Sequence, residues 1–340
     1  MVGNGRLSAG NGGTLRIMIL RRTFVSLLAA VAATAVGART AHGQASAVVL
    51  ALPASARAAG GGDASAFSTD ASALFYGAQH LPRERTVTVS AGTWIGGAQL
   101  ASLAYSTMVR WQPRFRSVLA VGVQSLDFGS ADEYVPDPLA GGTRGTATGS
   151  RVGAHELAAT IGLRQQVARM RVGMAVTYVQ QQVADARASA VMMSVADGVT
   201  VGGWDADLSL EHTGAPAGNP ARPSLSLPST MRGSVASPVW LLAGARWRGV
   251  AEVRRTNHEG STSVVGAEGS FTSGAGWELQ VRGAGLAYTD ETVRAPWSVG
   301  GSARRGAWSL DYAYQGYGAL GAVHRMGVTW RSHDPQGPSR

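Results

Sequence analysis

The feature that most constrains this chain is an alternation of apolar and polar residues that recurs after residue 84. Segment 204–211 reads WDADLSLE, with apolar residues at one parity and polar residues at the other. Segments 308–314 (WSLDYAY) and 325–331 (RMGVTWR) repeat the pattern. Side chains alternate between faces with a period of two only in a β-strand, because a helix would mix these residues on every side. The sequence therefore predicts an all-β protein.

The length of the alternating segments separates two all-β architectures. A soluble sandwich with one wet face would show the same alternation. The predicted strands, however, run about nine to fifteen residues, which exceeds the globular mean and suits a strand tilted across a membrane. Aromatic residues stand near strand ends on the apolar face, as in the interfacial girdle of a membrane barrel. They are Trp204, Trp277, Trp308, Tyr314 and Trp330. We predict a transmembrane antiparallel β-barrel of about fourteen strands over residues 84–331.

The connections between the predicted strands sort by parity. The long connections, 129–151 and 215–228, both follow odd-numbered strands, whereas those after even-numbered strands, such as 239–241, are short. Outer-membrane barrels keep their periplasmic turns short and place long loops outside the cell. The sorting favours the barrel over the sandwich. A tail, 332–340, follows the last strand.

The N-terminal 43 residues have the features of an export signal. Arg21 and Arg22 precede an apolar run, 23–38, and the small-x-small sequence Ala41-His42-Gly43 follows it. A charged start, an apolar middle and small residues at the cut are typical of a secretory signal peptide. The alternative is a membrane anchor, for which the run is short. We predict a signal peptide over 1–43, with 1–17 as a mis-called start, and a mature chain in the outer membrane of a Gram-negative cell.

Residues 44–83 differ in character from the barrel that follows. They are dominated by small residues, and they contain Gly60, Gly61 and Gly62. A short helix over 70–76 is expected, with Ser68, Thr69 or Asp70 as its cap. The glycines could cradle a phosphate, but they lack the lysine and the spacing of a P-loop. We predict a close-packed plug across the barrel, in which only small side chains fit.

The polar face of the strands carries ionisable groups of both signs, which a closed barrel would turn inward. Two interpretations stay open: an ion-paired network that fills a narrow lumen, or a channel lining that selects solutes. Asp311 and Arg325, on adjacent strands, are expected to pair with each other. The full set of predicted lumen-facing charges is Glu156, Arg164, Asp205, Asp207, Glu211, Arg232, Arg246, Arg248, Glu252, Arg254, Glu268, Glu278, Arg282, Asp311 and Arg325.

Several kinds of chemistry leave no signature in the sequence. The net charge is +9, but residues 1–43 hold five of the basic residues and no acid, and no basic block remains to bind nucleic acid. The chain has no cysteine, so no disulfide is expected. Its seven histidines form no metal-binding spacing, and no G-x-S-x-G elbow occurs. Asp132, Glu133 and Asp137 could bind calcium or simply lie in a solvated loop. We predict no catalytic activity, cofactor or metal.

Two segments resemble the PorV/PorQ family of outer-membrane proteins. In the predicted plug, Arg57, the three glycines and the box Asp70-Ala71-Ser72-Ala73-Leu74 resemble the family's N-terminal signature, although 77–79 (GAQ) stands where the family has Asn-Pro-Ala. Near the C-terminus, LDYAY at 310–314, followed by Leu320-Gly321 and His324-Arg325, resembles the family's last hairpin.

The resemblance implies a fourteen-stranded barrel with an N-terminal plug, similar to FadL. It also implies a non-catalytic role in protein secretion or surface assembly, as in the type IX secretion system, with a secretion pore or a secreted protein as partner. Two alternatives remain: a FadL-like passive channel for small or hydrophobic solutes, and an outer-membrane enzyme. A fold alone does not choose between these functions.

Overall fold

A computed structural model describes residues 47–112, 115–136, 145–217, 227–257, 260–289 and 294–332. All of these residues belong to one compact unit. The predicted signal peptide and Asp137 lie outside the described residues, as does the tail from 333 onward.

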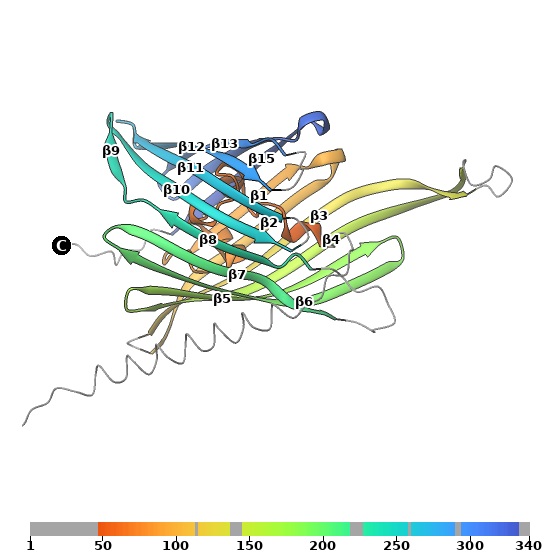
Figure 1. Ribbon diagram of the computed structural model, residues 1–340, viewed down its shortest axis with the longest axis horizontal. Helices are drawn as coiled ribbons and strands as arrows, with labels where there is room; N and C mark the ends of the chain where they lie inside the picture. Colours follow the sequence, from red (N-terminus) through yellow and green to blue (C-terminus); the bar gives the residue numbers. More distant parts are fainter. Residues whose placement is uncertain are drawn as a thin grey trace, which may run out of the picture. The chain divides into compact units, whose positions relative to one another are not determined.

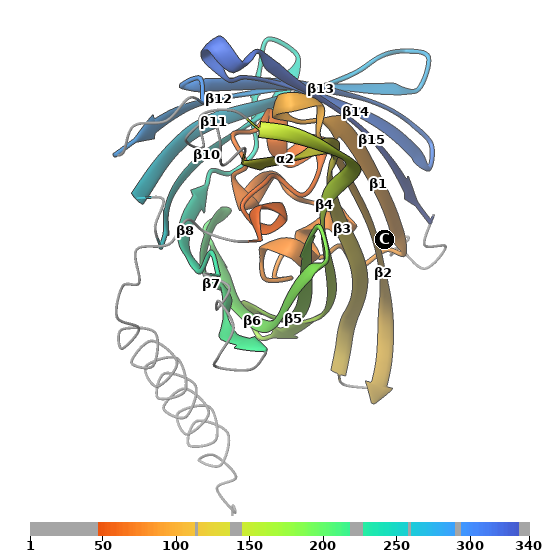
Figure 2. The same cartoon turned by 90° about the vertical axis from the view of Figure 1, so that its right-hand side faces the viewer.

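Fourteen antiparallel strands close into a barrel, with one additional short strand, as the alternation predicted (Figures 1 and 2). Neighbours in the chain are neighbours in the sheet, and the first strand pairs with the last: Thr86 lies opposite Arg331 and Thr93 opposite His324. The strands are β1 (Thr86–Thr93), β2 (Gln99–Gln112), β3 (Phe115–Pro136), β4 (Gly145–Val167), β5 (Met170–Val183), β6 (Ala186–Val201), β7 (Trp204–Ala217), β8 (Thr230–Ala236), β9 (Trp240–Leu242), β10 (Ala245–Thr256), β11 (Gly260–Thr272), β12 (Trp277–Tyr288), β13 (Trp297–Arg305), β14 (Trp308–Gly316) and β15 (Ala322–Arg331).

The additional strand, β9, continues β8 after a break at Pro238. Both β8 and β9 pair with the same edge of β10. The last regular hydrogen bond before the break is donated by Ser237 N to Gly249 O, at 2.9 Å. Proline has no N–H to continue the ladder, so pairing resumes only at Trp240. The tight turn therefore falls at 243–244, where both residues have positive φ, and the predicted turn at 239–241 was wrong.

The predicted loop 129–151 is mostly strand. β3 continues to Pro136 and β4 begins at Gly145, so the two form a hairpin that projects beyond the rest of the barrel (Figure 1). Side chains on both faces of this hairpin are exposed, so the sequence has no apolar stripe there to reveal a strand. We call the barrel end that carries this hairpin the loop end, and the opposite end, with the turns 168–169 and 202–203, the turn end.

Apolar side chains cover the outer face of the barrel. Leu103, Leu208, Val265 and Leu310 are each between 45% and 68% exposed, while their neighbours in sequence face inward. No helix within the described ranges is long and apolar enough to cross a membrane.

The segment from Ala47 to Leu81 lies inside the barrel and is almost entirely buried (Figure 2). It contains η1 (Val48–Leu50), α2 (Ala56–Gly60), η2 (Ser65–Phe67) and η3 (Ala71–Tyr76); two more single turns, η4 (Ile95–Gly97) and η6 (Gly318–Leu320), lie between strands. The expected helix over 70–76 is η3, and Asp70 caps it by accepting a hydrogen bond from Ser72 N at 2.8 Å. We call residues 47–81 the plug.

Candidate functional site

The centre of the lumen is a cluster of charges around Arg232 on β8. Its guanidinium donates to Glu211 Oε1 at 3.1 Å and to Glu252 Oε1 at 2.6 Å, and it lies over the ring of Tyr76 at 5.2 Å from the centroid. All four residues are buried. A buried charge is stable only when it is paired and hydrogen-bonded, so the plug and three strands depend on one another here.

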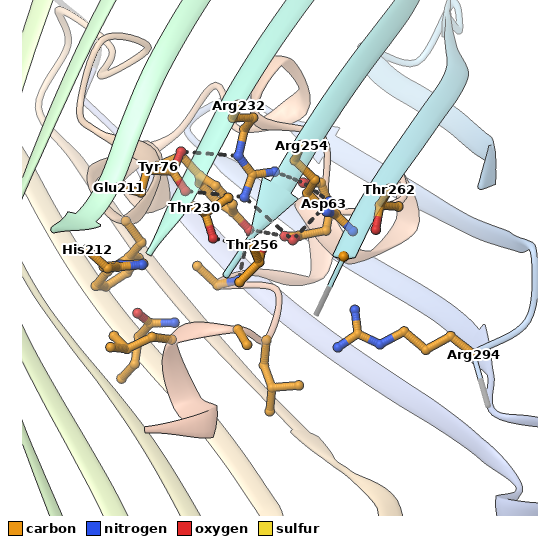
Figure 3. A pocket seen from close by; sticks show the side chains of 17 residues that line it. Asp63, Tyr76, Glu211, His212, Thr230, Arg232, Arg254, Thr256, Thr262 and Arg294 are labelled. Atoms are coloured by element: carbon orange, nitrogen blue, oxygen red, sulfur yellow. Dashed lines mark hydrogen bonds and ion pairs between the residues drawn. The ribbon is translucent and has the colours of Figure 1, made fainter. Parts of the chain in front are cut away.

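The wall charges of this cluster also bind the main chain of the plug (Figure 3). Arg232 donates to Asp63 O at 2.9 Å, and Arg254 donates to Gly62 O at 3.1 Å and to Asp63 O at 3.0 Å. Glu252 accepts from Ser65 N at 2.8 Å. Polar main-chain groups that the plug cannot pair within its short helices thus find partners on the wall.

Tyr76 joins the two halves of the plug. Its hydroxyl donates to Asp63 Oδ1 and accepts a hydrogen bond from Ala54 N at 2.9 Å. Burial, followed by the nearby Asp63 carboxylate, raises the pKa of Tyr76 well above its ordinary value. The phenol therefore keeps its proton and remains a donor.

A second cluster fixes the plug through Arg57, which lies on α2. Arg57 pairs with Glu268 at 2.6 Å, and Arg282 pairs with the same carboxylate at 3.1 Å. Arg282 reaches Asp311 at 3.4 Å, and Ser302 donates to Asp311 as well. The acid and base counts of this cluster are equal, so it places no net charge in the lumen.

The expected pair between Asp311 and Arg325 does not form. In the register of β14 with β15, Arg325 lies opposite Ala313, while Asp311 lies opposite Gly327. Arg325 instead donates to Pro53 O, to Ala54 O at 3.1 Å and to Ser90 Oγ at 2.9 Å. The plug main chain takes the place that the carboxylate was expected to fill.

A third cluster lies towards the turn end. Arg171 pairs with Asp205 at 2.9 Å and with Asp207 at 3.0 Å, Arg248 pairs with Asp205 at 2.6 Å, and His80 of the plug lies 3.4 Å from Asp207. Arg171 was missing from the predicted set. The period-two rule could have found it, because it shares the inward parity of β5 with Ala175 and Thr177.

The remaining predicted charges lie apart from these clusters. Glu156 accepts from Val49 N at 2.7 Å and from Gln181 Nε2 at 2.9 Å, and Arg164 donates to Leu81 O. Glu278 pairs with Arg304 at 3.6 Å, where both side chains are partly exposed. Arg246 is exposed near the turn end, and no ion pair joins it to another described residue.

The glycines of the plug are explained by close approach. A β-carbon on Gly60 would lie 2.8 Å from the Cα of Gly300 on β13, and one on Gly61 would enter the ring of Phe67. Gly62 has a φ of +72°, which disfavours any side chain. These contacts account for the triplet as packing and do not require a phosphate.

Little space remains between the plug and the wall. The cavity beside the central cluster has a volume of about 40 Å³ and is lined mainly by charged and hydroxyl side chains around Asp63, Arg232 and Arg254 (Figure 3). Such a volume and lining suit water molecules and not an organic solute. Within the described ranges, no three acidic or histidine side chains gather to hold a metal ion.

Neither family models nor curated proteins match this chain. Among solved structures, it is similar to the toluene transporter TbuX of Ralstonia pickettii, with 10% identity and a TM-score of 0.51 over 82% of this chain and 98% of that one. A FadL homologue of Pseudomonas aeruginosa gives 11% identity and a TM-score of 0.50 over 82% and 98%. CdiB of Acinetobacter baumannii gives 10% and 0.39 over 73% of this chain, which spans only 60% of that protein. The fold is therefore that of outer-membrane β-barrels.

Proposed function

We propose that this chain is an outer-membrane channel for small hydrophobic solutes, closed in this structure by its N-terminal plug. One observation carries the proposal: fourteen strands close around an N-terminal plug, in a fold that aligns with 98% of a toluene transporter. Members of one fold can differ in function, so the proposal needs a direct test. The structural neighbours named above give no support to a catalytic role.

The small space between the plug and the barrel wall favours a gated channel over an open pore. A site that holds benzene has a volume of roughly 150 Å³, whereas the cavity between the plug and the wall around Arg232 holds about 40 Å³. A solute can pass only when the plug moves. The inward charges then act as the binding surface for the plug, and a direct role in selecting solutes receives no support from the geometry.

A reversible lock on the plug tests this proposal. A β-carbon on Gly327 of β15 would lie 3.4 Å from the Cβ of Ala56, close to the Cβ separation of about 3.5–4.5 Å in a disulfide. The chain has no cysteine of its own, so A56C/G327C would form a single, defined cross-link. We expect toluene uptake into proteoliposomes to fall at least tenfold in the oxidised variant and to recover with reductant.

The matched controls are the single variants A56C and G327C, which carry the same substitutions without the lock. Equal uptake by oxidised and reduced double variant would show that plug movement is not needed. No uptake above empty liposomes, by the wild type or by a variant lacking residues 44–83, would overturn the channel proposal altogether.

A second candidate is non-catalytic assistance of protein secretion or surface assembly. What favours it is that residues of the segments that resemble PorV/PorQ shape and hold the plug: Asp70 caps η3, and Arg325 binds plug carbonyls. A permanently plugged barrel would act through its surfaces and would conduct nothing. Co-purification with a secretion pore, together with an absence of solute uptake, would favour this candidate.

A further inference from the structure

One acidic side chain of the described barrel faces the membrane. Asp197 lies on β6 between Ala196 and Gly198, which face the lumen, so its own side chain points outward. In the sheet it stands between Val172 of β5 and Leu208 of β7, which also face outward. The carboxylate is thus surrounded by apolar side chains on the lipid-facing side.

The register of β6 gives the depth of Asp197. Val201, at the turn end, pairs with Trp204, and Val191, towards the loop end, pairs with Tyr178. These two aromatic levels are ten residues apart along β6, about 25 Å along the membrane normal for a strand tilted as barrel strands are. Asp197 is four residues from Val201, and so lies about 10 Å inside the apolar band.

No group in the described chain neutralises this carboxylate by contact. Asp197 makes no hydrogen bond or ion pair with another described residue, and Arg171, across the wall, is already bound by Asp205 and Asp207. Between the two aromatic levels, the other outward positions of β5, β6 and β7 carry no charged side chain. A short aspartate side chain at this depth cannot reach water as an arginine can. An ionisable residue placed so in a membrane indicates an interaction, because its exposure to lipid costs free energy.

We propose that Asp197 marks a docking surface for a second outer-membrane protein, one that presents an arginine or lysine about 10 Å above the periplasmic boundary. We define the β5–β7 docking surface as Met174, Val195, Asp197, Val199, Ala206 and Leu208. The negative charge of Asp197 indicates which partner fits, because a buried carboxylate is stabilised by a cation. Lipid phosphates would repel the carboxylate, and they do not lie at this depth. The apolar residues around it would supply the contact area, and Asp197 the alignment.

Photo-cross-linking in native outer membranes tests the proposal. A benzoylphenylalanine at position 208, beside Asp197, should cross-link to one discrete protein. The control is the same probe at position 310, on the opposite wall, which should give no such cross-link. The two positions are comparable, because Leu208 and Leu310 are 45% and 57% exposed. The adduct at position 208 should fall at least fivefold in D197N and persist in D197E. All variants are first checked as folded barrels by their resistance to SDS without heating.

The identity of the contact completes the test. The cross-linked partner peptide should contain an arginine or lysine. Replacing that basic residue of the partner by glutamate should abolish the adduct. Combining this partner variant with D197R in the present chain should restore the adduct. Adducts to lipid alone, an adduct to a second copy of this chain, or equal yields from Asp197 and D197N would each overturn the proposal. None of these outcomes depends on whether a solute crosses the lumen.

Discussion

The two walls of the lumen hold the plug by different means. The wall of β2 to β5 offers small residues: Leu74 packs against Gly122 and Gly162, and a β-carbon on Gly173 would lie only 2.1 Å from Gly77 O. The wall of β7 to β12 offers charges, with Arg232 and its partners binding the plug main chain. The first wall holds the plug mainly by close packing at its glycines, and the second wall holds it mainly by ion pairs and by hydrogen bonds from charged side chains.

The difference suggests how the plug would move. Charged groups that leave their partners can be hydrated by entering water, whereas separated apolar surfaces lose the hydrophobic stabilisation outright. We therefore expect the plug to leave the wall of β7 to β12 first and to stay in contact with the wall of β2 to β5. The following variants test each side of this comparison, and all are measured as free energies of unfolding in liposomes by tryptophan fluorescence.

The largest effect is expected at the centre of the charged wall. Arg232→Met leaves Glu211 buried without its cation and leaves Glu252 with Arg254 at 3.8 Å, and removing one member of a buried ion pair costs about 3–5 kcal/mol. The control is Arg246→Met, at an exposed site without an ion pair among the described residues, which should change stability by less than about 0.5 kcal/mol. A loss below about 1 kcal/mol for Arg232→Met would show that the charged wall does not hold the plug.

The small-residue wall should respond to added volume. Gly173→Ala places a methyl group against the main chain at Gly77 and Gln79, which cannot move aside as a side chain can. Overpacking of this kind costs about 1–3 kcal/mol. Gly283→Ala on β12, where a β-carbon meets its nearest atom at 3.6 Å, is the matched control and should be near neutral. Equal effects of the two variants would remove the distinction between the walls.

The sequence predicted those parts of the fold in which a strand has lipid on one face and the polar lumen on the other. Lipid on one side and a polar interior on the other force the alternation, and the alternating segment 308–314 lies within β14 (Trp308–Gly316). Where that contrast is missing the prediction failed. The tip of the β3–β4 hairpin is exposed on both faces, and it carries no alternation from which a strand could be recognised.

The partners of the inward charges were harder to predict than their direction. The alternation predicts that Arg325 faces inward, and it does, but its partners are the carbonyls of Pro53 and Ala54. A main-chain acceptor has no signature in sequence, since every residue carries one. Charge matching therefore suggested Asp311, and the register of β14 with β15 together with the position of the plug shows why that pairing fails.

Glu156 offers a smaller test, because it is a buried acid on the wall whose glycines pack against the plug. It accepts the N–H of Val49 and the amide of Gln181 without any cation. Glu156→Gln keeps one acceptor oxygen but turns an amide donor towards one of these donors, so we expect a loss of about 1–2 kcal/mol. Glu156→Leu, which removes both acceptors, should cost more. A neutral Glu156→Gln would mean that η1 does not depend on this contact.

The smallest effect is expected where the charged wall meets water. Glu278 and Arg304 lie 3.6 Å apart with side chains 28% and 37% exposed, so solvent and salt already screen their attraction. Glu278→Gln should cost no more than about 0.5 kcal/mol at low salt and nothing measurable in 1 M salt. Arg232→Met, deep in the same wall, should keep most of its effect in that salt because ions cannot reach the buried carboxylates. If both variants lost their effects in parallel as salt rose, the charges around Arg232 would be hydrated in solution, and the plug would already be partly detached from that wall.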